Sequence, residues 1–179
     1  MTSDSGLFRN AEQLRADGFE RDGPDWVYDP RSAPPSAKRI LRYVPLYESK
    51  MLNFYDHRYA DFALAIEKVG VDFREIPHPT HTQLADPRYE ISPRFWVDKN
   101  DALSRIGQNC SDKWLFGVRG LTNATNQRTL VASAFPFGGV GNSFHVWSVS
   151  RENFGGRTVA LYANLSTLII DYVVRQKVG

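Results

Sequence analysis

The sequence predicts an α+β fold in which a small antiparallel sheet packs against a long C-terminal helix. Three apolar segments with strand composition lie close together, at 113–120, 128–137 and 144–149. Strands at this short spacing favour an antiparallel meander. The helix is expected over 157–177, because apolar residues recur there at helical spacing: Leu161, Leu165, Leu168, Ile169 and Tyr172.

The first half of the chain predicts shorter elements. Residues 39–55 have strand composition, and Pro45 should confine that strand to a sheet edge or divide it in two. PRFWV (93–97) is expected as a short strand, and the proline-rich segment 71–93 as an extended loop. Helices are expected over 9–16 and 60–69, and from Asp98 as N-cap to about Ile106.

Length and punctuation suggest one folded domain with a lead-in. The chain has 179 residues, enough for one sizeable core. Residues 1–38 are polar and rich in proline and glycine, so we expect an irregular lead-in or linker there. The domain itself should occupy 39–179.

Composition narrows the functional classes. Lys and Arg number 22 against 20 Asp and Glu, a net charge of +2, which is low for a free-standing nucleic-acid binder but acceptable for one wall of a groove. A single cysteine, Cys110, excludes a disulfide framework and a CxxC zinc cage, and it fits a reducing cytoplasm. The apolar stretch 158–174 is interrupted by polar residues, so it indicates a core helix rather than a membrane span.

The segment TNATNQR (122–128) concentrates amides, hydroxyls and an arginine between two apolar strands. Asn and Gln side chains can pair with the major-groove edge of adenine, and Arg with that of guanine. The same residue types are also common in ordinary turns. Both interpretations stay open from composition alone.

Catalytic and metal motifs are weak. Asp25, Glu48 and Lys50 fit the loose PD-(D/E)xK pattern of Mg²⁺-dependent nucleases, but Asp25 lies in the proline-rich lead-in. His78 and His81 are three residues apart, near Asp72 and Asp86, but they lie in a proline-rich loop, whereas zinc needs three or four preorganised ligands, which Cys110 could join only if the fold allowed it. No catalytic residue and no metal ligand is assigned.

Four blocks occur in a recognisable order: PLYESKMLNFYDHR (45–58), PRFWV (93–97), WLFGVRGLTNATNQRTLVASAFPFGGVGN (114–142) and LYANLSTLIIDYVVRQKVG (161–179). Together they resemble the specificity region of Type II restriction–modification enzymes that carry an adenine-N6 DNA methyltransferase. The resemblance spans 45–179, with a variable gap at 59–92. It departs from the family pattern at Ser49, at Gly120 and in the segment Leu165-Ser166-Thr167.

The resemblance implies a target-recognition domain. Its partners would be double-stranded DNA and a methyltransferase domain or subunit, which binds S-adenosylmethionine and flips the target adenine. This chain has no NPPY-type motif and no glycine-rich cofactor turn, so no cofactor is expected in it. We therefore expect a non-catalytic, cytoplasmic fragment, truncated at its C-terminus, of a methyltransferase or restriction enzyme.

Ten residues are the candidates for DNA contact. Phosphate contacts would give affinity, and base-edge contacts would give specificity. Basic residues are assigned to phosphates: Lys50, Arg58, Arg119, Arg128, Arg175 and Lys177. Four amides are assigned to base edges, and the loop residues His78 and His81 are further candidates for this role. The amides are Asn123, Asn126, Gln127 and Asn142.

Two other hypotheses remain. The chain could be a Mg²⁺-dependent nuclease that uses Asp25, Glu48 and Lys50. It could also be a non-catalytic protein-interaction remnant, in which an exposed apolar face of helix 157–177 pairs with a partner or a second copy.

Overall fold

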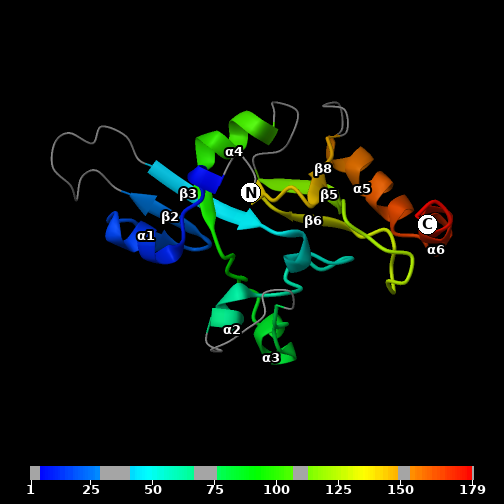
Figure 1. The fold of residues 1–179 in the computed structure, drawn as a ribbon, viewed down its shortest axis with the longest axis horizontal. Coiled ribbons are helices and arrows are strands. Elements are labelled where there is room, and N and C mark those ends of the chain that lie inside the picture. Colours follow the sequence, from blue (N-terminus) through cyan, green and yellow to red (C-terminus); the bar gives the residue numbers. More distant parts are fainter. Residues whose placement is uncertain (1–4, 29–40, 67–75, 107–112, 149–153, 179) are drawn as a thin grey trace.

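The protein is a mixed α+β structure with two sheets (Figure 1). A computed structural model describes residues 5–28, 41–66, 76–106, 113–148 and 154–178. The first sheet has the order β1-β2-β3-β4, with β7 also pairing with β3, and the second has the order β6-β5-β8. Pairing is antiparallel throughout except between β3 and β7.

The first sheet is built around β3 (Leu41–Tyr47), which lies between β2 (Asp25–Tyr28) and β4 (Trp96–Asp98). Pro45 is therefore in a central strand, not at an edge. It is tolerated because pairing with β2 ends at Tyr43, whereas parallel pairing with β7 (Gly139–Val140) begins at Leu46. The missing N–H of Pro45 falls between these two ladders.

The two faces of this sheet bury different residues. Leu14 of α1 (Ala11–Ala16) packs with Trp26 and Trp96 on one face. Val44 and Val97 pack with α4 (Lys99–Ile106) on the other. As expected, the carboxylate of Asp98 begins α4: it accepts bonds from the backbone N–H groups of residues 100 and 101, at 2.7 and 3.3 Å.

Residues 1–38 were expected to be an irregular lead-in, but their described part is folded. After a short 3-10 helix η1 (Ser5–Leu7) come α1 and β1 (Glu20–Asp22), and β1 pairs with β2 at the edge of the first sheet. Gly18 and Gly23 both have positive φ, at 82° and 59°, and allow the tight turns that join these elements.

The second sheet differs from the predicted meander in its strand order. β5 (Trp114–Arg119) is central, with β6 (Ala132–Pro136) on one side and β8 (Phe144–Val146) on the other. The third strand thus pairs with the first, because the intervening glycine-rich segment crosses to the first sheet as β7. The four residues 115–118 of β5 are all buried, since both faces of this sheet are covered.

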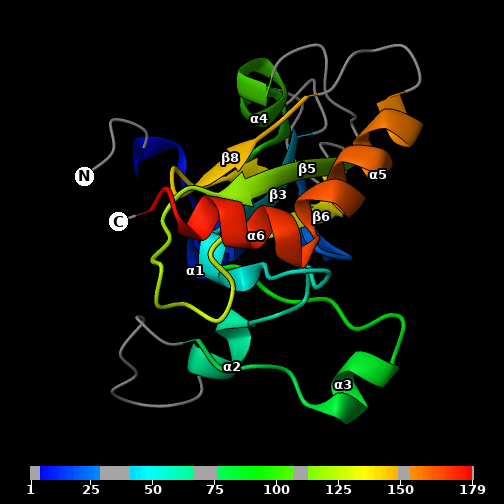
Figure 2. The same ribbon diagram turned by 90° about the vertical axis from the view of Figure 1, so that its right-hand side faces the viewer.

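The prediction of a single long C-terminal helix is wrong. It is replaced by α5 (Phe154–Leu165) and α6 (Leu168–Arg175), which Figure 2 shows beside the second sheet. Thr167 divides them: its backbone is extended, with ψ at 149°, and its hydroxyl accepts a bond from the N–H of Ile170. A hydroxyl residue in this geometry is a strong helix N-cap, so it starts a new helix.

The segment 59–92 contains more regular structure than expected. The predicted helix 60–69 is observed as α2 (Phe62–Ile66), and residues 67–69 of that prediction lie outside the described residues. The proline-rich part contains α3 (His81–Ala85), which was not predicted, with Thr80 as its N-cap. A 3-10 helix, η3 (Ser49–Met51), follows β3 and leads into this segment.

A substitution at Gly117 tests how closely β8 approaches β5. A Cβ at this position would lie 2.2 Å from the carbonyl oxygen of His145 and 2.7 Å from the ring of Phe144. We expect Gly117→Ala to lower the free energy of unfolding by about 3 kcal/mol, since backbone cannot yield as a side chain can. Urea unfolding would measure this.

Gly155→Ala is the matched control. A Cβ at Gly155 meets nothing within 4 Å, and the residue is in α5. This substitution should be neutral or stabilise by up to about 1 kcal/mol. Equal effects of the two substitutions would contradict the close strand contact.

Candidate functional site

Residues of the first and third sequence blocks line one polar cleft, and residues of the fourth block support its walls from outside. The cleft lies between the segment that follows η3 and the loop 120–131 that joins β5 to β6, next to Arg119 at the end of β5. Its volume is about 310 Å³. Of the described residues that line it, five carry an amide or a guanidinium group and none is acidic. The lining residues are Asn53, Phe54, Tyr59, Arg119, Asn126, Gln127, Arg128 and Val131.

The loop beside the cleft is held from behind by α6. Arg175 donates to three backbone carbonyls of the loop, those of Ala124, Asn126 and Gln127, at 2.6, 2.9 and 3.1 Å. Asp171 accepts from the backbone N–H groups of Thr129 and Leu130, both at 2.8 Å. We call Asp171 and Arg175 the α6 clamp.

The two residues of the α6 clamp also contact each other. They are four residues apart on one helix, with an N–O distance of 3.3 Å, and Asp171 is only 5% exposed. Burial raises the pKa of Asp171, but the N–H groups of Leu130 and Thr129 and the guanidinium of Arg175 lower it more, so its pKa lies below the ordinary range. The carboxylate stays ionised and keeps accepting from the loop.

Arg119 anchors the other wall of the cleft. Its Nη2 donates to the carbonyl oxygens of Ser49 and Leu52, at 3.1 and 2.7 Å. Burial lowers the pKa of this guanidinium, which nevertheless remains protonated as arginine does in proteins. The segment after η3 is thereby fixed to the end of β5.

Aromatic side chains complete the cleft. The guanidinium of Arg128 lies 4.6 Å from the ring centre of Phe54, a cation–π distance. Tyr55 has a positive φ of 56°, and its N–H donates to the hydroxyl of Tyr162 on α5 at 3.0 Å. The rings of Phe54, Tyr55 and Tyr162 form a continuous chain of contacts, so α5 positions the aromatic side of the cleft.

Four of the ten predicted contact residues line the cleft: Arg119, Asn126, Gln127 and Arg128. The side chains of Asn126 and Gln127 are exposed. Asn123 is in the same loop, where its Oδ1 accepts from the N–H of Thr125 at 3.0 Å. Arg175 lies behind the loop and bonds its backbone.

The other predicted residues lie elsewhere. Arg58 donates to the carbonyls of Leu84, Asp86 and Tyr89, and so closes the segment around α3. Lys50 lies 3.9 Å from Glu48 and against the ring of Phe62. Lys177 is exposed just after α6, and Asn142 is exposed at a second pocket.

The two loop histidines are not brought to the cleft. His78 Nδ1 lies 2.7 Å from the carbonyl oxygen of Tyr59, with the two rings in contact. His81 is exposed in the first turn of α3. Within the described ranges, three His, Cys, Asp or Glu residues nowhere gather as metal ligands would; Asp72 and Cys110 lie outside those ranges.

Sequence reasoning missed several residues of the site. Asn53 and Phe54 belong to the first resembling block and Tyr59 directly follows it, but none of them carries a separate signal in the sequence, and Asp171 stands out there only as an interruption of an apolar stretch. The spacing of Asp171 and Arg175 at i and i+4 was the available clue, since it places both on one helix face.

The proposed nuclease residues do not come together. Asp25 is bound to Arg42 at 2.7 Å, beside Trp26, which pairs with Tyr43. Asp25 therefore lies opposite position 44 of β3. Glu48, just beyond the end of β3, is four residues further along, which is roughly 13 Å at 3.3 Å per residue. Carboxylates that share Mg²⁺ each bind at about 2 Å, so this pair is too far apart to do so.

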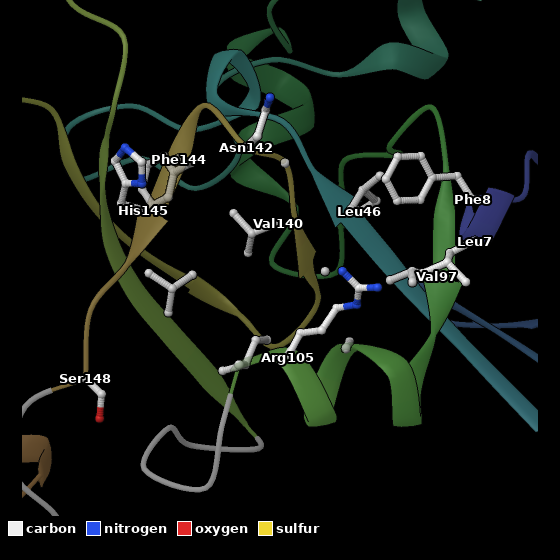
Figure 3. Close-up of a pocket in the computed structure, with 15 residues that line it drawn as sticks. Leu7, Phe8, Leu46, Val97, Arg105, Val140, Asn142, Phe144, His145 and Ser148 are labelled. Carbon is white, nitrogen blue, oxygen red and sulfur yellow. The ribbon is translucent and has the colours of Figure 1, made fainter. Parts of the chain in front are cut away.

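Two further pockets lie outside the cleft. One, of about 400 Å³, is mostly apolar and lies between α4, β7 and β8 (Figure 3), with Arg105 reaching into it from α4. The other, of about 360 Å³, is lined by three prolines and by Tyr47, His57 and Glu90 among others. Neither brings together the predicted contact residues.

Comparison of the chain with protein-family models, curated proteins and solved structures finds no match. Among the described residues, the structure has no helix of the length and apolar character that crossing a bilayer requires.

The α6 clamp gives the protein a defined response to acid. The folded-state pKa of Asp171 is lower than its unfolded value, so its contribution to stability is present above the unfolded pKa, near 4, and is lost as pH falls through the folded pKa. Unfolding measured from pH 6 to pH 2 should show this loss.

Asp171→Asn should remove that part of the pH dependence and cost about 1–3 kcal/mol at neutral pH. An unchanged pH profile in the variant would show that the carboxylate does not carry the clamp.

Proposed function

We propose that this chain is the DNA sequence-recognition part of a restriction–modification protein that carries an adenine-N6 methyltransferase. The observation that carries the proposal is the polar cleft, which the first and third resembling blocks line and the fourth supports through Tyr162 and Arg175. Methyl transfer belongs to another domain or subunit, which would bind S-adenosylmethionine. This chain would contribute position on the target site.

The chemistry of the cleft supports base recognition. Asn126 and Gln127 each present an amide with one acceptor and two donor hydrogens, the combination that pairs with adenine N6 and N7. Both side chains are exposed, and their backbone carbonyls are already bound to Arg175. The amides therefore point out from a loop whose backbone is fixed.

Electrostatics favour a polyanion at the same place. Arg119 and Arg128 line the cleft, and none of the other described lining residues is acidic. A guanidinium held in place over an aromatic ring, as Arg128 is over Phe54, is preorganised for a phosphate oxygen. Because the net charge is only +2, we expect modest affinity outside the full enzyme.

The first experiment is selection from a pool of randomised duplexes, followed by binding of the enriched duplex across a salt series. The chain should enrich a defined sequence, and log K should fall by about 0.9 per phosphate neutralised as log salt rises. Absence of enrichment together with salt-independent binding would refute the proposal.

Arg128→Ala should weaken binding to all duplexes alike and reduce the salt slope by about one. Arg88→Ala is the matched control, because Arg88 is 91% exposed beside α3 and away from the cleft, and it removes the same charge. Equal effects of both variants would mean that Arg128 acts only through net charge.

Asn126→Ala and Gln127→Ala should each relax selectivity at one base pair, by about 1–3 kcal/mol, with little change in the salt slope. Asn100→Ala is the control: it deletes an exposed amide in the first turn of α4 and should leave selectivity intact. Binding of single-base variants of the enriched duplex measures this. Selectivity that survives in both loop variants would place base reading elsewhere.

A further inference from the structure

We infer that Asp171 and Arg175 are positioning residues for specificity: by binding the loop backbone, they set where the amides of Asn126 and Gln127 meet the bases. The inference rests on the proposed function. It assigns to α6 a role in sequence reading although neither clamp side chain need touch DNA.

The α6 clamp binds both the acceptors and the donors of the loop backbone. The guanidinium of Arg175 donates to three carbonyls, and the carboxylate of Asp171 accepts from two N–H groups, all within residues 124–130. These residues lie outside β5 and β6, so they have no strand partner to fix them. The clamp supplies the order that a sheet would otherwise give.

The orientation of α6 favours positioning over stabilisation. A surface helix normally buries its apolar face. Here α6 turns Asp171 and Arg175 inward, whereas Leu168, Ile169 and Tyr172 are 72%, 75% and 64% exposed. The side chain of Arg175 is 31% exposed, and ion pairs, even partly buried ones, contribute less to stability than apolar packing does, so the arrangement is better explained by the single loop conformation that it enforces.

Base reading requires such a fixed conformation. A hydrogen bond to a base edge is made within about 2.7–3.2 Å and weakens steeply outside that range. A loop backbone free to shift by 1 Å would lose these contacts while still attracting phosphates. Positioning by α6 therefore predicts a loss of selectivity separate from a loss of affinity.

Arg175→Lys tests the inference, because a lysine keeps the charge but cannot present the planar fork that reaches three carbonyls. Selectivity for the enriched duplex over a single-base variant should fall about tenfold, with the salt slope and the affinity for unrelated duplex unchanged. Tyr172→Ala, on the outward face of α6, is the control and should keep full selectivity.

Amide hydrogen exchange gives a readout without DNA. Asp171→Asn should speed exchange at Thr129 and Leu130 at least tenfold, but not at Arg119, whose N–H bonds the carbonyl of Val131 in the adjoining strand pair. This variant also serves for the selectivity measurement if Arg175→Lys does not fold.

The outcomes separate the two proposals. Wild-type enrichment with full selectivity in Arg175→Lys and Asp171→Asn would overturn the positioning role and leave the proposed function standing. A wild-type chain that selects no sequence would overturn the proposed function itself. Selectivity and affinity that fall together, with a changed salt slope, would mark Arg175 as a phosphate contact and overturn positioning.

Discussion

Peptide groups in irregular segments need hydrogen-bond partners, and in this protein charged side chains supply many of them. Arg58, Arg119 and Arg175 together donate to eight backbone carbonyls, three, two and three respectively. Asp61 and Asp171 each accept from two backbone N–H groups. All but one of these bonds join segments distant in sequence, so the long loops are held to one another, to β5 and to α6 without becoming strands.

The same use of charge explains why only some of the predicted phosphate ligands reach the candidate site. Guanidinium groups suit carbonyl oxygens as well as phosphate oxygens, and a sequence shows the arginine without its partner. Arg58 and Arg175 serve the backbone, whereas Arg128 lies on Phe54 at the cleft. Arg119 does both, since it lines the cleft and holds the segment after η3.

Local signals predicted local structure well. Asp98 and the residues after it gave α4, and strand composition located β4, β5, β6 and β8 to within a few residues. The strand order of the second sheet and the place of Pro45 depend on pairing between distant segments, which periodicity does not contain. The division of the last helix was visible in principle, since Thr167 is a good N-cap residue within an otherwise continuous apolar pattern.

The candidate site shows the same limit. The amides of Asn126 and Gln127 stand out by composition, but Phe54 reaches the cleft, and Asp171 holds the loop beside it, only through contacts across 74 and 42 residues of chain. Because Arg175 grips carbonyl groups, which every amino acid carries, the side chains at positions 126 and 127 can be exchanged while the loop keeps its path. Under the proposed function, a loop held in this way would let the recognised base sequence change without a change of fold.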